Sequence, residues 1–487
     1  MPFLPRPPSP IISCGLACFF IIPFGLFAQS KIRLSKNKLR AIEFIENHEQ
    51  QFVSWNNQLW EFAEPPLKET KSVKLLVNIL RDEGFRIEEN VSGFPTIFIA
   101  TYGAAKPIVG LFGEYDADPH ASNKIVPRHE ELMKGGYGHG GHHNLLATGS
   151  LGAALAIKNL IQQGRLNCSI RYYGTTAEGS IGAKAYLARD GYFDDLNFSL
   201  YWHPAPATWA STRPWDALID FDIIFSARQL NVIREAGNAS TTLDAMEMMV
   251  QDLKRLRTQL TPLVRMNYFV HQERGNLNEI GDTTRLSVRI QCAKQEDALN
   301  LFQKTQEAVR RTATTLHVGA SIDVHRAMHQ FLPNVSAMTV VQKNMEMVGP
   351  TIYTEDEQNF TKEMQETLRI SPDGIEDKIS EFADESNRPS LYGYASDIGD
   401  PSWIAPEVYF VVRTLPAVPM HQWAGTAFSA HAIGHKGMLK ASKILSLTII
   451  DYVESKSLQE AILDDFKRNK KSYIYKSLLT SASPTGN

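Results

Sequence analysis

Cysteine is scarce in this sequence, with four residues among 487. Cys14 and Cys18 lie inside an apolar N-terminal run that we interpret as a leader, so only Cys168 and Cys292 would remain in the mature chain. These two residues are far apart, and each lies within a predicted strand. A framework of disulfide bonds is therefore excluded by count.

The sequence also lacks an excess of either charge. Lysine and arginine number 50 against 53 aspartates and glutamates, so the net charge is -3, and the pI is near 6.5. No block of like charge, internal repeat or low-complexity tract is present. Because phosphate binding depends on clustered basic residues, nucleic acid is not an expected partner.

One long apolar run is present, at residues 11–28, and it follows Arg6 and precedes the polar residues Gln29, Ser30 and Lys31. This layout is typical of a secretory signal peptide. We predict a signal peptide at residues 1–28, which places the mature protein in the periplasm or outside the cell and off the membrane. The run is also about long enough to anchor the chain in a membrane if it stays uncleaved.

The length of the chain exceeds what one hydrophobic core usually organises. Predicted strands alternate with helices, which indicates an open α/β sheet with mostly parallel pairing. Within residues 215–330 the order becomes strand, helix, strand, strand, helix, strand, the order of a ferredoxin-like α+β unit. We therefore predict an α/β domain formed by residues 37–214 and 331–455, interrupted by an inserted domain. Residues 456–487 are charged, then rich in Ser and Thr, and are predicted to be a frayed tail.

Polar clusters accompany the predicted strands, where open α/β sheets place their ligands. Imidazole and carboxylate are the usual ligands of zinc-like ions, and a nearby Glu can accept a proton from water that such an ion activates. Taken singly, each cluster has a simpler interpretation: His203 as a structural residue, His139 and His142 as solvated loop residues, and the glycines as turn residues. Only their joint occurrence supports the interpretation that they form a metal site. The clusters are residues 113–116, 138–144, 177–179, 202–204 and 420–423.

With these residues the sequence resembles the zinc peptidase and amidohydrolase family of aminoacylases, glutamate carboxypeptidases and auxin-conjugate hydrolases, and within it the p-aminobenzoyl-glutamate hydrolase branch. The resemblance extends over roughly residues 40–455 and is carried by several specific motifs. It implies an α/β fold in which a zinc-peptidase-like catalytic domain holds an inserted ferredoxin-like α+β lid, a domain that commonly mediates dimerisation. The motifs are Gly113-Glu114-Tyr115-Asp116-Ala117, Gly138-His139-Gly140, His143-Asn144-Leu145-Leu146, Trp202-His203-Pro204, Phe331-Leu332-Pro333-Asn334, Ser396-Asp397-Ile398-Gly399-Asp400, Ser402-Trp403 and Gly434-His435-Lys436-Gly437-Met438.

The resemblance also implies roles for individual residues. His143, His203 and His421 match metal ligands of the family, Glu178 matches its general base, and Asp116 is retained as a further catalytic residue.

The sequence departs from the family pattern at two ligands. Gly141 stands where a Cys that bridges two metals is expected, and Gly179 replaces the second Glu of a Glu-Glu pair. His142 or His139 could compensate as an additional ligand.

The lid departs from the family pattern as well. Asn231 replaces a His that usually reaches a neighbouring active site, and Arg274 replaces the first Gly of a Gly-Gly motif. Asn278 is retained, so we predict substrate or lid contacts at Asn231 and Asn278.

Two functions remain open at this point. The leading hypothesis is a metal-dependent amidohydrolase that cleaves the amide of an N-acyl or p-aminobenzoyl amino acid, a small-molecule substrate. Because two anionic ligands are missing, we expect one zinc or manganese ion, or none, rather than two. The alternative is a non-catalytic relative that acts as a binding or partner subunit. In either case the chain is expected to form a homodimer, or a heterodimer with a paralogous subunit.

Overall fold

The computed structural model describes residues 34–227, 230–231, 241–271, 279–386, 391 and 393–479. The predicted signal peptide, residues 1–28, lies outside this range, so its cleavage stays a prediction.

A seven-stranded sheet in the order β1-β2-β4-β3-β5-β13-β6 forms the centre of the α/β part. The four central strands β4, β3, β5 and β13 are parallel, whereas β1, β2 and β6 pair antiparallel, so the expected parallel pairing holds only in the middle of the sheet. Strand β13, which follows the inserted domain in sequence, pairs with β5, which precedes it. Chain segments on both sides of the insertion therefore build one sheet. The bounds are β1 (Arg86–Glu89), β2 (Phe98–Tyr102), β3 (Ile108–Glu114), β4 (Ser169–Thr175), β5 (Phe198–Ala205), β6 (Trp209–Ala210) and β13 (Glu407–Arg413).

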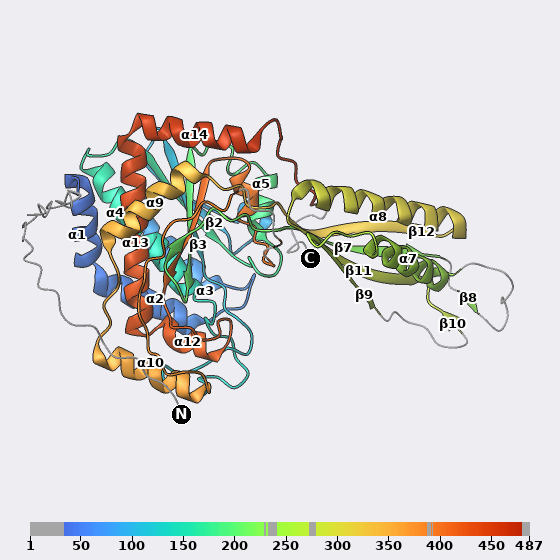
Figure 1. Cartoon of the computed structure of the whole chain (residues 1–487), viewed down its shortest axis with the longest axis horizontal. Helices are drawn as coiled ribbons and strands as arrows, with labels where there is room; N and C mark the ends of the chain where they lie inside the picture. Colours follow the sequence, from blue (N-terminus) through green and yellow to red (C-terminus); the bar gives the residue numbers. More distant parts are fainter. Residues whose placement is uncertain are drawn as a thin grey trace, which may run out of the picture. The chain divides into compact units, whose positions relative to one another are not determined.

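Helices bury the sheet. Helices α4 and α13 pack against each other and against its strands, and α1, α2 and α9 contact them from outside (Figure 1). Because β3, β5 and β13 are covered on both faces, they read as nearly continuous buried runs rather than as an alternation. The helices are α1 (Lys36–Asn47), α2 (Glu49–Phe62), α3 (Thr70–Asp82), α4 (His143–Gln162), α5 (Ala183–Arg189), α9 (Val335–Val348), α10 (Glu355–Thr367), α11 (Gly399–Ser402), α12 (Trp423–Ser429), α13 (Ala432–Glu454) and α14 (Lys456–Lys470), with a 3-10 turn at Val91–Gly93.

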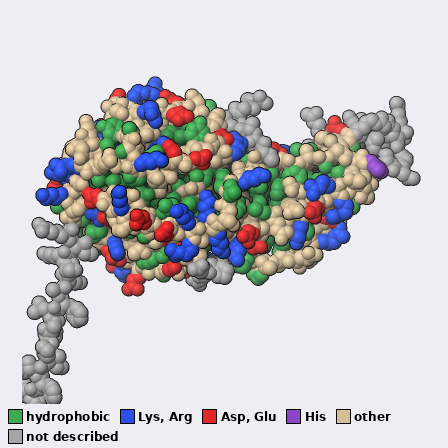
Figure 2. Space-filling model, turned by 90° about the horizontal axis from the view of Figure 1, so that it is seen from above, with side chains coloured by type: hydrophobic (Ala, Val, Ile, Leu, Met, Phe, Trp, Pro, Cys, Tyr) green, Lys and Arg blue, Asp and Glu red, His purple; other side chains and the backbone are tan. Residues whose placement is uncertain are grey.

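Helix α4 is the one helix, within the described residues, that is long and apolar enough to cross a membrane, and 83% of its most apolar window is buried inside the protein. Its apolar character therefore fits a core helix. On the surface drawn in Figure 2, Lys and Arg side chains are interspersed with Asp and Glu, in keeping with the balanced composition.

The inserted domain is a four-stranded antiparallel sheet in the order β12-β7-β11-β9. Helices α7 and α8 pack on this sheet, where Phe221 of β7 meets Phe302 of α8 edge to face. In chain order the strands are arranged 4-1-3-2, so the ferredoxin-like topology is confirmed. Met266 is the one fully buried residue of β9, which lies at the edge of this sheet. The bounds are β7 (Ala217–Ser226), α7 (Thr242–Arg257), β9 (Val264–His271), β11 (Thr283–Cys292), α8 (Gln295–Leu316) and β12 (Gly319–Met328), with a small ladder of β8 (Leu230–Asn231) and β10 (Glu279–Ile280).

The C-terminal region is not the frayed tail that its charged composition predicted. Residues 456–470 form α14, which packs on α9 and α13. Its Asp465 accepts a hydrogen bond from the backbone N–H of Ser336, and the carbonyl of Ile462 accepts one from the amide of Asn334. Most charged residues of this helix face solvent, and a narrow buried stripe of Ile462, Asp465 and Phe466 holds it in place.

The chain beyond α14 covers a buried polar pair at the end of the inserted domain. His329, which directly follows β12, lies with Nδ1 2.9 Å from Asp400 Oδ1, and both side chains are buried. Tyr473 lies with its hydroxyl 2.8 Å from His329 Nε2, and the Tyr475 hydroxyl donates to Asp400 at 2.9 Å. The two tyrosines thus complete the hydrogen bonds of a pair that has no access to water.

Replacing Tyr475 with Phe is expected to lower the free energy of unfolding by about 1–3 kcal/mol, because it leaves a buried carboxylate short of one donor. Urea denaturation measures this. Ile474 is the matched control, since its side chain is 85% exposed and Ile474→Ala should change stability by less than about 0.5 kcal/mol. Equal effects of the two substitutions would show that the segment adds no stability through Asp400.

Candidate metal centre

Three side chains from three elements converge at one edge of the main sheet. Glu114 is the last residue of β3, His143 is the first residue of α4, and His203 lies on β5. Each offers a donor atom, and the three atoms lie within 4.8 Å of one another. In the part of the chain that the structure describes, they are the one such group of His, Cys, Asp and Glu residues.

Glu114 is completely buried and ionised. Its Oε1 accepts hydrogen bonds from the ammonium of Lys184 at 2.5 Å and from the hydroxyl of Tyr201 at 3.0 Å. Burial alone would raise the pKa of Glu114, but the charge of Lys184 and the neighbouring imidazoles lower it to about 2. Oε1 of Glu114 is therefore occupied by these two donors, and its Oε2 points towards His143.

His143 is oriented by a carboxylate on the far side of its ring. Its Nδ1 lies 2.9 Å from Asp116 Oδ1, and its Nε2 lies 3.3 Å from Glu114 Oε2. Burial lowers the pKa of His143, but the charges of Asp116 and Glu114 outweigh this effect and raise it to about 10. Because a carboxylate accepts the Nδ1 proton, Nε2 is the nitrogen available to a metal.

His203 is a neutral donor. Its Nδ1 donates to the backbone carbonyl of Pro204 at 2.6 Å, which leaves Nε2 with a free lone pair. Burial and the charge of His143 lower the pKa of His203 to about 4. The two rings meet edge to face with their centroids 5.6 Å apart.

The donor set fits a divalent metal ion. Glu114 Oε2 and His143 Nε2 are buried and make no hydrogen bond, although each faces the other. Their charges pair at 3.3 Å, and a metal ion could bind both atoms once the proton on His143 Nε2 is released. Two imidazoles and one carboxylate are a set known from catalytic zinc sites, which use three protein ligands and keep a further position open.

His421, which the resemblance implies as the third histidine ligand, is not part of this group. Its Nδ1 lies 3.1 Å from Asp118 Oδ1, and 59% of its side chain is exposed. Its Nδ1 faces Asp118, and the third donor of the group is Glu114. A ligand role for His421 stays a prediction.

The two compensating histidines are also used elsewhere. His142 is buried with Nε2 donating to the carbonyl of Gly425 and Nδ1 accepting from Thr414, both at 2.8 Å, so neither nitrogen is free. His139 donates from Nε2 to the carbonyl of Leu59 at 3.0 Å and lies outside the group of three. Burial lowers the pKa of His139 to about 4 and that of His142 to about 3, so both are neutral. His142 therefore has no free nitrogen, whereas Nδ1 of His139 is buried without a hydrogen-bond partner. A ligand role for His139 stays a prediction.

The two predicted catalytic carboxylates have different surroundings. Asp116 contacts His143 directly and so acts through that histidine. Glu178 is half-buried in the turn after β4. Burial and the negative charges of Glu114 and Asp397 raise the pKa of Glu178 to about 7, which suits an acid-base group near neutral pH.

The two glycines at the lost ligand positions differ in the space around them. A side chain at Gly141 would meet the ring of His421, with a Cβ 2.8 Å from its Cε1. A side chain at Gly179 would meet nothing within 4 Å. Position 179 is therefore open to a larger residue, whereas the ring of His421 fills the space beside Gly141.

Sequence reasoning missed the part that Glu114 plays. It lies in the quoted Gly113-Glu114-Tyr115-Asp116 motif, but the resemblance drew attention to Asp116 instead. Lys184 and Tyr201 were missed entirely, because a lysine in a helix and a tyrosine in a strand carry no signal for a buried site. The lid residues remain untested: Asn231 contributes its backbone to β8, and Asn278 lies outside the described residues.

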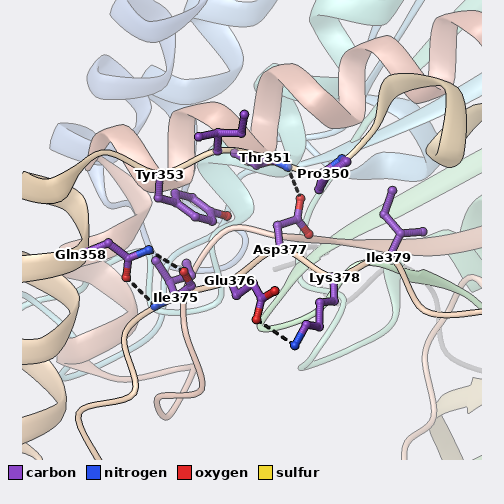
Figure 3. A pocket seen from close by; sticks show the side chains of 10 residues that line it. Pro350, Thr351, Tyr353, Gln358, Ile375, Glu376, Asp377, Lys378 and Ile379 are labelled. Carbon is purple, nitrogen blue, oxygen red and sulfur yellow. Dashed lines mark hydrogen bonds and ion pairs between the residues drawn. The ribbon is translucent and has the colours of Figure 1, made fainter.

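A hollow of about 650 Å³ lies elsewhere, and the metal cluster takes no part in it. Figure 3 shows three pairings among its polar groups: Asp377 with the backbone of Thr351, Gln358 with Ile375, and Glu376 with Lys378.

No family model matches the chain. Among curated proteins, a subunit of the p-aminobenzoyl-glutamate hydrolase of Escherichia coli (strain K12) is 26% identical over 451 residues, covering 85% of this chain and 92% of that protein. Among solved structures, a dinuclear metal binding peptidase from the M20 family of Bacillus subtilis has a TM-score of 0.53 at 12% identity, covering 84% of this chain and 99% of that one. An aminobenzoyl-glutamate utilization protein from Klebsiella pneumoniae has a TM-score of 0.53 at 14% identity, covering 81% and 97%.

The inserted-domain α/β architecture, the convergence of His143 and His203, and these likenesses agree with one another. Over most of its length the chain is similar in sequence to this p-aminobenzoyl-glutamate hydrolase subunit, and it has the fold of the M20-family peptidase.

Proposed function

We propose that this chain is an amidohydrolase that works with a single zinc or manganese ion held by Glu114, His143 and His203. The observation that carries the proposal is the meeting of three donor atoms within 4.8 Å, two of them buried and without a hydrogen bond. A second ion would need donors beyond this set, and Gly141 and Gly179 supply none.

A bound ion of this type polarises a carbonyl and lowers the pKa of water. The protein supplies the rest. Glu178, with its pKa near 7, accepts a proton from the attacking water and returns it to the leaving amine. Asp116 holds the His143 ring in the orientation that presents Nε2.

For the substrate we propose the amide of an N-acyl or p-aminobenzoyl amino acid. The name of the Escherichia coli relative, a p-aminobenzoyl-glutamate hydrolase subunit, supports this class. The same name supports a partner subunit, so we propose that the chain pairs with itself or with a paralogous chain. The apolar run at residues 11–28 supports secretion or a periplasmic location.

Elemental analysis and an amide-hydrolysis assay test the proposal. The purified mature protein should hold about one zinc or manganese ion per chain and hydrolyse p-aminobenzoyl-glutamate or N-acyl amino acids. Chelation should remove the activity, and adding the metal back should restore it. Two tightly held ions per chain would contradict the single-metal site, and an inactive protein that retains one ion would contradict the proposed activity.

A second candidate function rests on the same two glycines. With Gly141 and Gly179 at ligand positions and His421 paired with Asp118, the chain could serve as a non-catalytic binding or partner subunit. In that case the protein should hold no metal after dialysis and should show no hydrolysis alone. Activity should then appear only when a paralogous subunit is added.

A further inference from the structure

Glu114 is anchored through only one of its two carboxylate oxygens. Oε1 carries the hydrogen bonds from Lys184 and Tyr201, whereas Oε2 carries none and faces His143. Rotation of the carboxylate would break two buried hydrogen bonds, so these partners determine which oxygen the site presents.

Lys184 is itself held firmly. It is the second residue of α5, its side chain is completely buried, and its ammonium lies 2.7 Å from Asp397 Oδ1. The other oxygen of Asp397 accepts the backbone N–H of Lys184 at 2.9 Å. Asp397 thus fixes both ends of this lysine, and the Lys184 ammonium also lies 5.5 Å from the centroid of the Tyr201 ring.

We propose that Lys184 and Tyr201 are positioning residues for the metal, which orient Glu114 so that Oε2 completes the donor set with His143 and His203. This inference rests on the proposed single-metal site. It also assigns a role to Asp397 of the Ser396-Asp397-Ile398-Gly399-Asp400 motif, which the proposed chemistry does not use. Asp397 places the lysine, and the lysine places the ligand.

The charge of Lys184 has a second consequence. Three carboxylates, Glu114, Asp397 and Glu178, affect one another electrostatically in this buried region. A site with one metal ion lacks the positive charge that a second ion would bring. The Lys184 ammonium, ion-paired with two of the carboxylates, supplies a permanent positive charge at this place.

Titration of the metal-free full-length mature protein with zinc and with manganese tests the inference. Metal affinity is measured by competition with a chromophoric chelator, which needs no turnover. Residues that orient metal ligands typically contribute 10–100-fold to affinity, so Lys184→Met should weaken binding by about that factor. Tyr201→Phe removes one hydrogen bond without changing the shape of the core and should weaken binding about threefold to tenfold.

The chain offers matched controls for both changes. Lys440 is another buried lysine, 4% exposed and 2.6 Å from Asp377, and Lys440→Met should leave metal affinity within about twofold. Tyr172 is a buried tyrosine whose hydroxyl donates to the backbone of Ala147, and Tyr172→Phe controls for the loss of a tyrosine hydroxyl. Thermal unfolding identifies any variant that is not folded. If Lys184→Met does not fold, Tyr201→Phe still tests the inference.

The outcomes distinguish a failure of this inference from a failure of the proposed function. Tight metal binding in the native protein, with Tyr201→Phe and folded Lys184→Met unchanged, would overturn this inference and leave the proposed function intact. Tighter binding in Lys184→Met would also overturn it, because the lysine would then be competing with the metal for Glu114. A native protein that binds neither ion would overturn the proposed single-metal site, and the inference with it.

Discussion

Replacing His203 with Ala is expected to weaken metal binding by at least about 100-fold, whereas replacing His421 with Ala should change it by less than about threefold. His203 presents a free Nε2 to the cluster because Nδ1 is committed to the Pro204 carbonyl. His421 instead pairs with Asp118 and lies outside the group of donors. Two histidines that the resemblance treats alike should therefore behave differently.

Zinc affinity of the metal-free variants measures this difference, with hydrolysis as a second readout. His435→Ala is a further control, since His435 belongs to another quoted motif and bonds to Asn57 rather than to the cluster. If His421→Ala lost as much affinity as His203→Ala, the His421 ring would have to leave Asp118 and join the metal. The site would then have four protein donors.

Replacing Glu178 with Gln should lower the rate of amide hydrolysis by about 10²–10⁴-fold and leave metal affinity within about twofold. The substitution keeps the shape of the side chain and removes its ability to take up a proton. Glu178 is not one of the three donors, so the metal should remain. The measurement is kcat at saturating substrate, together with metal content.

Glu407 provides the control for this change. It is a buried glutamate whose pKa is raised by burial, and its carboxylate accepts a hydrogen bond from Ser199. It lies at the start of β13, in register with Ser199, whereas His203 is in register with Val411. Glu407→Gln should therefore leave kcat unchanged within about twofold. A normal rate in Glu178→Gln would exclude Glu178 as the general base.

The sequence by itself determined the architecture and two of the three residues of the candidate metal cluster. Buried strand runs alternating with amphipathic helices specify an α/β sheet, because both depend on local periodicity. The inserted domain was recognisable from the order of its elements. His143 and His203 were found because each lies in a specific motif, beside a helix start and on a strand.

The tertiary structure alone decided what the remaining polar residues do. Both nitrogens of His142 are bonded, to Thr414 and to Gly425. His139 and His421 each bond through one nitrogen, to Leu59 and to Asp118, and lie outside the group of three donors. These pairings join residues separated by 80 to 303 positions, so no local pattern records them.

Long-range pairing likewise created the role of Glu114. Its anchor Lys184 lies 70 positions away and Tyr201 lies 87 positions away. The order of residues along the chain determines which chemical groups are available and on which local elements they lie. Which of those groups keep a free lone pair is decided by hydrogen bonding in the folded core, where each donor and acceptor must find a partner.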